Sequence, residues 1–252
     1  MYQRLRVFTC ALALLAGSLT CVLAQAETYK VGATATGVPF TFLDVKSNSI
    51  QGMMVDSAHA VAKAAGFDVE ITQTTFAALI PSLTAKKIDL ISAAMLRTPE
   101  REKVVQYSDP VFEYGEGLIV RDDDTQAYTS MDDFKGEVVG AQVGTVFLDE
   151  LNRRGFFKEV RGYDSLADLT RDLALGRIKA GFGDHPILAY QKAQGTLKKV
   201  RLVDSYKPQV IGQVCLIMRK GDPQMLAQVN QGIARIKADG TLASIIGKWQ
   251  LD

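Results

Sequence analysis

The chain contains few of the residues that build disulfides and metal sites. Of its 252 residues, only three are cysteines and two are histidines. Cys10 and Cys21 lie in a predicted signal segment, so Cys215 alone remains in the mature chain and no intrachain disulfide can form. Neither His59 nor His185 has a second histidine or a cysteine at the spacing of a metal site. We therefore expect no metal centre and no cofactor.

Enzyme motifs and basic clusters are also missing. The chain has no G-x-S-x-G nucleophile turn, no G-x-x-x-x-G-K-[ST] phosphate loop and no H-E-x-x-H zinc motif. Its formal net charge is +1 and becomes −1 once the two arginines of residues 1–26 are removed. No run of five or six basic residues occurs. This charge pattern argues against nucleic acid as a partner.

Long apolar runs are confined to the N-terminus. Two arginines precede an apolar run over residues 7–15, and an A-x-A pattern ends at Ala26. These features are typical of a signal peptide cleaved after Ala26, which places the mature chain in the periplasm. The run is shorter than the roughly 20 residues that span a bilayer. A lipoprotein site at Cys21 is the alternative, and Thr20 argues against it because a small residue is expected there.

Predicted strands and helices alternate through the rest of the chain. The predicted strands cover residues 29–32, 69–72, 90–94, 138–140, 178–182 and 214–218. The predicted helices cover residues 54–65, 76–83, 145–153, 165–176, 223–238 and 241–249. Such alternation predicts an α/β fold with βαβ units and a mostly parallel sheet.

A series of short motifs carries a resemblance to a known family. In chain order they are Val38-Pro39-Phe40, the run from Phe76 to Leu83, Ile88-Asp89, Thr98-Pro99-Glu100-Arg101, Tyr107-Ser108-Asp109-Pro110, Val143-Gly144-Thr145, Gly181-Phe182-Gly183-Asp184 and Asp239-Gly240-Thr241 with Trp249. Together they resemble the family-3 extracellular solute-binding proteins, which serve polar amino-acid ABC transporters. The motifs follow the family's order over nearly all of residues 29–249.

The resemblance implies a two-lobed periplasmic binding protein of type II with two crossover strands at the hinge. The first lobe would comprise residues 27–116 and 214–252, and the second residues 117–213. A small amino-acid-like ligand would bind between the lobes and hold the hinge closed. The implied partner is an ABC permease in the inner membrane, and the protein is expected to be a monomer without enzymatic activity.

Arg101 is the first candidate for ligand binding. Thr98 can cap a short helix that starts at Pro99, which puts Arg101 one turn beyond the cap. A guanidinium can hold a carboxylate through two parallel hydrogen bonds. Residue chemistry alone favours a surface arginine paired with Glu100 or Glu102. The resemblance implies that Arg101 contacts the ligand.

Thr145 and Asp184 are the other polar candidates. Thr145 is expected to start a helix whose amides and dipole attract an anion, while its hydroxyl donates as well. An ordinary N-cap is the alternative, and both roles are compatible. The resemblance implies that Asp184 receives the ligand's α-ammonium group, whereas a helix cap before Pro186 is the alternative. Together with Arg101, these residues describe a site for an α-amino acid.

Several positions depart from the family pattern. They are Gly37, where relatives carry an aromatic residue, Met54 in an acidic motif, and Ala94 and Leu96 in place of hydroxyl residues. A more apolar pocket follows, with Phe76, Met95 and Leu96 as candidate walls or, equally, as core residues. The ligand need not be a standard polar amino acid.

Two other functions remain open at this point. Some relatives are periplasmic dehydratases that act on prephenate or arogenate, and their acid falls at Ile187 here. Isoleucine cannot transfer a proton, although Glu113 or Asp44 could face the cleft. The second of these functions is that of a sensor protein that presents its ligand to a receptor. Neither the role of His185, at a turn or in the cleft, nor that of Cys215 is decided by the sequence.

Overall fold

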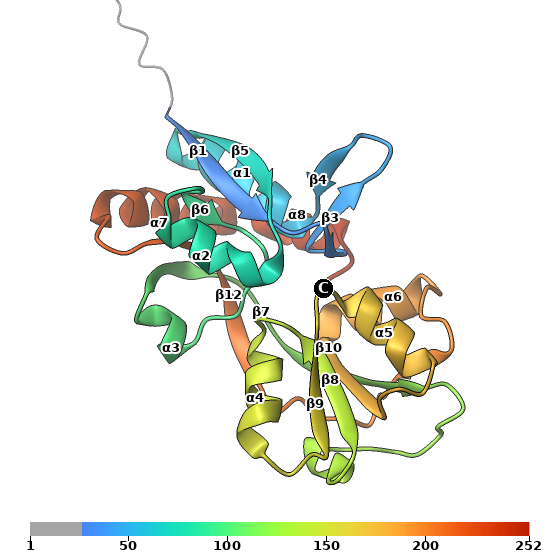
Figure 1. The fold of residues 1–252 in the computed structure, drawn as a ribbon. Coiled ribbons are helices and arrows are strands. Elements are labelled where there is room, and N and C mark those ends of the chain that lie inside the picture. The colour runs from blue at the N-terminus through green and yellow to red at the C-terminus, as the bar shows by residue number, and fades with distance from the viewer. Residues whose placement is uncertain (1–26, 252) are drawn as a thin grey trace, which may run out of the picture.

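The computed structural model describes residues 27–251, so the predicted signal peptide and its cleavage site lie outside the described residues (Figure 1). The strands are β1 (Thr28–Ala33), β2 (Thr36–Gly37), β3 (Thr41–Asp44), β4 (Ser49–Gln51), β5 (Asp68–Gln73), β6 (Leu90–Ile91), β7 (Val105–Arg121), β8 (Val138–Gln142), β9 (Glu159–Tyr163), β10 (Ala180–Asp184), β11 (Val200–Leu202) and β12 (Ile211–Arg219). The α-helices are α1 (Met53–Ala65), α2 (Leu79–Thr84), α3 (Pro99–Glu102), α4 (Val146–Arg154), α5 (Leu166–Ala174), α6 (His185–Ala193), α7 (Pro223–Ala238) and α8 (Thr241–Lys248). Two short 3₁₀ helices are η1 (Phe76–Ala78) and η2 (Met131–Phe134).

The chain forms two lobes with the same strand order. In the first lobe β1 lies between β5 and β6 and runs parallel to both, with α1, α2, α7 and α8 packed around them. In the second lobe β8 lies between β9 and β10, again in parallel, with α4, α5 and α6 around them (Figure 1). The structure thus contains a repeated topology that the sequence does not display as a repeat.

The long strands β7 and β12 join the two lobes. They pair antiparallel with each other, and this pairing extends to Gly115 of β7. From Glu116 onward β7 pairs antiparallel with β10 of the second lobe. The whole sheet is therefore mixed. The predicted parallel pairing holds within each lobe, and the antiparallel pairs arise because β7 and β12 cross between the lobes.

Local sequence patterns explain the helices that were predicted best. Helix α1 buries one apolar face, which includes Val55, Ala58 and Val61, and it packs against α7. It ends at Gly66, whose φ of 85° lets its N–H bond to the carbonyl of Ala62 at 2.9 Å. The predicted helices at 54–65 and 223–238 are confirmed to within one residue.

The predicted strand over residues 90–94 is wrong at its C-terminal end. Only Leu90 and Ile91 are in a strand, and Ala94 has a φ of 54°. A left-handed conformation costs a residue with a Cβ atom roughly 1–2 kcal/mol. The chain turns away from the sheet here, and the Ser92 hydroxyl donates to the Met54 carbonyl at 2.7 Å. This turn aims the Ala94 carbonyl at the space between the lobes.

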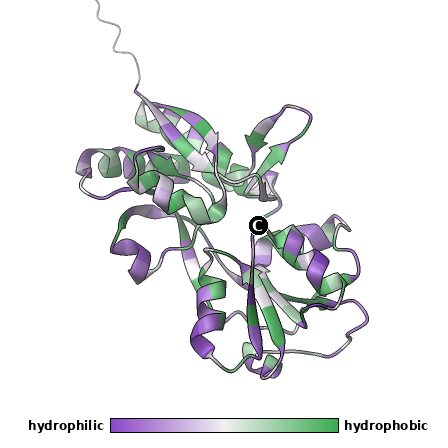
Figure 2. Ribbon diagram, in the orientation of Figure 1, coloured by the Kyte–Doolittle hydropathy of each residue, from purple (hydrophilic) through white to green (hydrophobic). Residues whose placement is uncertain are grey.

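Apolar residues gather on the strands and on the helix faces turned toward them, while the outer helix faces are hydrophilic (Figure 2).

Cys215 is 1% exposed in the first lobe's core, and burial raises the pKa of its thiol to about 11. The thiolate is the reactive form, so the structure explains Cys215 as a packing residue. Across residues 27–251, no helix is both long enough and apolar enough to span a bilayer.

Candidate functional site

Two adjoining cavities lie between the lobes. The inner cavity is narrow and is lined by Phe76, Leu96, Arg101, Tyr114, Thr145, Val146, Phe147 and Asp184. The outer cavity is also narrow and is lined by Thr34, Thr36, Gly37, Phe40, Thr41, Phe76, Ala93, Ala94, Tyr114, Gln142, Leu166, Asp184 and Ile187. Three residues line both cavities: Phe76, Tyr114 and Asp184. The cavities are therefore two parts of one cleft.

Arg101 lies at the inner end of the cleft. Its backbone N–H donates to the Thr98 hydroxyl at 3.2 Å, which confirms the predicted cap of α3. Its guanidinium donates to the Leu96 carbonyl at 2.5 Å and, across the cleft, to the Gly144 carbonyl at 2.8 Å. These bonds hold the planar group at the cavity wall. A guanidinium has five N–H donors, so donors remain for an anion.

The nearby glutamates do not engage Arg101. Glu102 forms an ion pair with Arg97, and Glu100 lies 3.9 Å from the Lys103 ammonium. The surface-pair alternative for Arg101 does not describe its position, because its partners are backbone carbonyls of both lobes. Its positive charge is not neutralised by a neighbouring glutamate.

Thr145 caps α4 from the second lobe. Its hydroxyl oxygen accepts the Leu148 N–H at 3.3 Å, and its hydroxyl proton is donated to the Gln142 carbonyl at 2.7 Å. This proton is therefore engaged within the protein, which differs from the expected donation to a ligand. The first N–H groups of an α-helix have no intrahelical partner. Val146 and Phe147, the first two residues of α4, carry such N–H groups and line the inner cavity together with Arg101.

Asp184 ends β10 where the two cavities meet. It occupies the N-cap position of α6, but its side chain makes no capping bond, so the helix-cap alternative does not hold. Its carboxyl group is hydrogen-bonded to the Tyr114 hydroxyl. Burial raises the pKa of Asp184 above its ordinary value, although the Tyr114 bond and the Arg101 charge act in the opposite direction. Burial thus makes this acid easier to protonate than an exposed aspartate.

Tyr114 is the central residue that the sequence reasoning missed. Its ring is stacked on Phe40, with ring centroids 5.5 Å apart, and its hydroxyl lies 2.8 Å from the Ala94 carbonyl oxygen. The same hydroxyl contacts Asp184. Burial raises the pKa of Tyr114 well above its ordinary value, so its hydroxyl stays protonated. A tyrosine within a largely apolar strand is the one signal that could have marked it, because buried tyrosine hydroxyls require partners.

The three candidate wall residues occupy different places. Phe76 lines both cavities, and Leu96 lines the inner one. Met95 lines neither, because it is 2% exposed within the core cluster that also contains Leu79 and Ile217. The alternating direction of successive side chains turns Met95 into the core while Leu96 faces the cleft. Met95 is therefore a packing residue.

The candidate acids of a dehydratase do not reach the cleft. Ile187 lines the outer cavity and faces Gly37, where an added Cβ atom would lie 3.6 Å from the Ile187 Cδ1 atom. Glu113 is exposed, and Asp44 accepts hydrogen bonds from Ser47 in the β3–β4 turn. Neither lines a cleft cavity. Asp184 is the one carboxyl group among the lining residues of both cavities.

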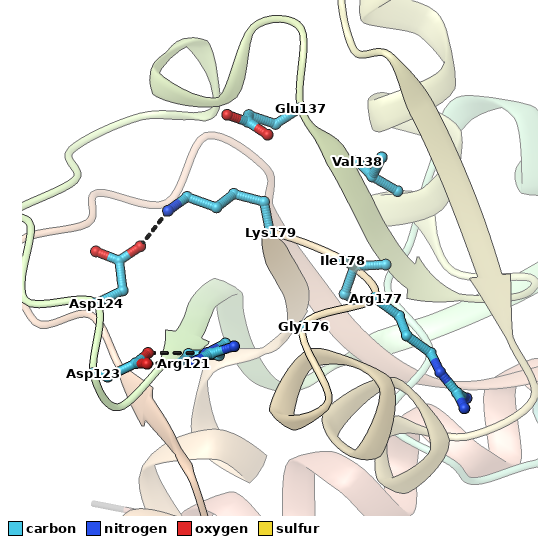
Figure 3. Close-up of a pocket in the computed structure, with 9 residues that line it drawn as sticks. All are labelled: Arg121, Asp123, Asp124, Glu137, Val138, Gly176, Arg177, Ile178 and Lys179. Atoms are coloured by element: carbon cyan, nitrogen blue, oxygen red, sulfur yellow. Dashed lines mark hydrogen bonds and ion pairs between the residues drawn. The ribbon is translucent and has the colours of Figure 1, made fainter.

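A third hollow adjoins the outer cavity, since Thr34, Thr36, Phe76 and Gln142 line both, and it adds the carboxyl groups of Asp164 and Asp168. His185 lines a surface hollow beside Phe112 and the C-terminal segment, not the cleft. Another hollow lies on the second lobe and is lined mainly by charged residues (Figure 3). There Lys179 pairs with Asp124 at 2.6 Å, and Arg121 pairs with Asp123. Residues 27–251 contain no cluster of three metal-ligating side chains.

Known proteins match this chain over nearly its whole length. Residues 29–252 match the sequence profile of the bacterial extracellular solute-binding proteins, family 3. ABC transporter arginine-binding protein 1 of Escherichia coli (strain K12) is 30% identical, over 94% of this chain and 97% of its own length. The L-cystine-binding protein TcyJ of the same strain is 29% identical, over 88% of this chain and 82% of its own length.

Solved structures show the same fold. An ancestral arginine-binding protein bound to arginine has a TM-score of 0.79 and 31% identity, covering 89% of this chain and 99% of that structure. An ancestral amino-acid-binding protein described as a precursor of cyclohexadienyl dehydratase has a TM-score of 0.78 and 31% identity, with coverages of 88% and 95%. The predicted two-lobed fold of type II is confirmed.

Proposed function

The chain belongs to family 3 of the bacterial extracellular solute-binding proteins, and we propose that its cleft captures a small amino-acid-like carboxylate for delivery to an ABC permease. The observation that carries this proposal is the pairing of Arg101 with the start of α4 across the inner cavity. The two groups come from different lobes. A ligand held by both would favour the closed arrangement over an open one.

The inner cavity has the chemistry of a carboxylate site. Arg101 offers a guanidinium, and the N–H groups of Val146 and Phe147 lie at the positive end of the α4 dipole. Hydrogen bonds to charged groups contribute on the order of 1.5–3 kcal/mol each. Thr145 supports this site by capping the helix, and Phe76 and Leu96 form apolar walls that exclude water.

We propose that the lobes, residues 27–116 with 214–252 and residues 117–213, move as units about β7 and β12. The change of partner in β7 between Gly115 and Glu116 supports this division. Closure brings Gly144 against Ala77, where an added Cβ would lie 3.0 Å from the Ala77 Cα atom. The close approach of these backbones supports Gly144 as a contact point of the closed state.

The proposal includes a periplasmic location, a monomeric state and no enzymatic activity. Export is supported by the N-terminal pattern and by a family that is extracellular. The lack of catalysis is supported by Ile187 and by the hydrogen bonding of Asp184 inside the protein. Consumption of prephenate by the purified protein would instead identify an enzyme, and binding to a receptor rather than a permease would identify a sensor.

The first test is a binding measurement on protein refolded from denaturant, which removes any ligand that copurifies. A ligand at a hundredfold excess over its Kd stabilises the native state by about 2.7 kcal/mol. Amino acids and their carboxylate analogues are screened by thermal shift, and Kd values follow by calorimetry. Arg101→Ala should weaken binding by about 100-fold or more, because it removes charge-assisted bonds to the carboxylate.

Arg97→Ala is the matched control, since Arg97 is a neighbouring arginine that pairs with Glu102 and lines neither cavity. It should keep the wild-type Kd. Wild-type affinity in Arg101→Ala, or equal losses in both variants, would refute the carboxylate site. Stimulation of a reconstituted permease and its ATPase by the loaded protein would support delivery.

A further inference from the structure

Tyr114 places its hydroxyl between two hydrogen-bond acceptors of the cleft. One is the Ala94 carbonyl oxygen at 2.8 Å, and the other is the Asp184 carboxyl group. A tyrosine hydroxyl has one proton and so can donate to only one of them. We call the space between these two acceptors the ammonium subsite, because a carboxylate and a carbonyl oxygen are the partners that an ammonium group requires.

The count of protons indicates how this arrangement is satisfied. If Asp184 is ionised, Tyr114 donates to it and the Ala94 carbonyl is left facing the hydroxyl lone pairs. If Asp184 is protonated, Asp184 donates to Tyr114, and Tyr114 donates to Ala94, so every group is paired. Burial raises the pKa of Asp184 in the direction that the second arrangement needs. Unpaired buried polar groups are costly, which favours the neutral acid.

The charges of the cleft bear on this protonation state, because the Arg101 charge favours an ionised Asp184 while burial favours the neutral acid. Among the residues that line the two cavities, the titratable groups are those of Arg101, Tyr114 and Asp184. With Asp184 neutral and Tyr114 protonated, these two cavities carry the single positive charge of Arg101, while Asp164 and Asp168 line the adjoining hollow. A monoanionic carboxylate balances that charge. A zwitterionic amino acid brings an additional positive charge, which would need an ionised Asp184.

Tyr114 is also held in place. Its side chain is 8% exposed, and its ring is stacked on Phe40 of the first lobe. Among the polar groups of the outer cavity, the hydroxyls of Thr34 and Thr41 are bonded to each other at 2.7 Å, and Thr36 and Gln142 are the remaining polar residues without a titratable group. The neighbouring walls, Phe76 and Ile187, are apolar. Burial, the Phe40 stacking and the two acceptors therefore hold the hydroxyl between Ala94 and Asp184.

We propose that Tyr114 fills the ammonium subsite and thereby selects small carboxylates that lack an α-ammonium group, such as 2-oxo and 2-hydroxy acids. This inference rests on the proposed function, because it assumes the carboxylate site at Arg101. It names the ligand class for that site. It also makes Tyr114 a specificity-determining residue, since an ammonium group would have to displace its hydroxyl from both acceptors.

The test compares ligands that differ only at the α-position. Leucine and phenylalanine are each measured beside the corresponding 2-hydroxy and 2-oxo acids by calorimetry at pH 7. For wild-type protein we expect Kd values at least 10-fold lower for the 2-hydroxy or 2-oxo acid. Tyr114→Ser, which empties the ammonium subsite, should reverse this preference by at least 10-fold. Tyr128→Phe, which removes a hydroxyl bonded to Asp124 outside the cleft, should keep the wild-type preference.

The outcomes separate this inference from the proposed function. A wild-type preference for the amino acids overturns the role of Tyr114 and leaves the carboxylate site intact. If neither leucine and phenylalanine nor the corresponding 2-hydroxy and 2-oxo acids bind, and the other amino acids of the thermal-shift screen do not bind either, the proposed function is overturned. If Tyr114→Ser does not fold, the ligand preference of Tyr114→Phe, which also lacks the hydroxyl, is measured in its place. The wild-type preference tests the role of Tyr114 in either case. An unchanged preference in a folded Tyr114→Ser protein also contradicts the inference.

Discussion

Two acidic residues occupy paired positions on neighbouring strands, and they differ in burial and in the number of their donors. Asp184 of β10 and Glu116 of β7 are register partners, and each binds a tyrosine hydroxyl. Glu116 is 0% exposed and accepts from Tyr206 at 2.7 Å. It also accepts two backbone N–H groups, from Gln209 at 2.7 Å and Val210 at 2.9 Å.

Asp184 has a single side-chain donor, Tyr114, and that hydroxyl is shared with the Ala94 carbonyl. Three donors stabilise a carboxylate in a dry interior. At Asp184 the shared Tyr114 donor, a backbone hydrogen bond and the Arg101 charge do not outweigh burial, and the pKa of the carboxyl is raised. Glu116 ties the segment after β11 to β7, while Asp184 borders the cleft. The proposed ligand contact therefore concerns Asp184 and not Glu116.

Glu116→Ala should lower the free energy of unfolding by about 3 kcal/mol, because it leaves buried donors without their acceptor. In a chain of this size that corresponds to roughly 6–12 °C in Tm. Thermal and urea unfolding measure it. Glu113→Ala is the control, since Glu113 is exposed on the same strand. Equal stability of the two variants would show that Glu116 has no structural role.

Tyr206→Phe should cost about 1.5–2 kcal/mol of unfolding free energy. It removes one of the three donors to Glu116, and hydrogen bonds to charged groups contribute on the order of 1.5–3 kcal/mol. Urea unfolding at pH 7 is the measurement. In the Glu116→Ala background the same change should cost much less. A full loss in both backgrounds would mean that Tyr206 acts through packing alone.

Asp184→Asn should stabilise the ligand-free protein at pH 7, by less than the losses above. A carboxyl whose pKa is raised on folding binds protons more tightly in the native state, so its presence lowers stability as the pH rises. This deficit is absent below the ordinary Asp pKa of about 3.9 and is complete above the raised pKa. The difference in Tm between variant and wild type should therefore shrink as the pH falls toward 4. A variant that is less stable at pH 7 and recovers in acid would indicate an ionised, stabilised Asp184.

Tyr114→Phe should have the smallest effect on stability, about 0.5–1 kcal/mol. The variant removes one hydroxyl shared between two acceptors, and a typical hydrogen bond contributes about 0.5–1.5 kcal/mol net. Measured by urea unfolding without ligand, the loss should be smaller than that of Tyr206→Phe. A loss as large as that of Tyr206→Phe would place Tyr114 with the structural tyrosines.

Local sequence signals predicted much of the fold. The helices at 54–65 and 223–238 were found because their apolar periodicity, glycine stop and proline start are local features. The Thr98 cap before Arg101 was found for the same reason. The strand at 90–94 was predicted too long, because nothing in its apolar sequence reveals the φ of 54° at Ala94.

The candidate site was predicted only in part, and the reason lies in sequence separation. Arg101 was singled out from its local motif as a candidate for binding a carboxylate. Its hydrogen bond to the Gly144 carbonyl joins residues 43 positions apart, which no local pattern indicates. Tyr114 and Asp184 are 70 residues apart, and no spacing rule connects them. Met95 and Leu96 are neighbours with opposite environments, which an irregular segment does not reveal. The Thr145 cap was foreseen, whereas the engagement of its hydroxyl proton by Gln142 was not.

The amino-acid sequence was sufficient to locate most helices and strands, the order of the family motifs and the polar candidates Arg101, Thr145 and Asp184. Those features depend on contacts within a few residues and on side-chain chemistry. The folded molecule was needed to show which polar groups are already satisfied by the protein. That allocation depends on strand register and on the approach of the two lobes, which bring Tyr114 to Asp184 and Tyr206 to Glu116. The physical reason is that each proton and each lone pair serves one partner at a time, so availability to a ligand is a property of the packed molecule.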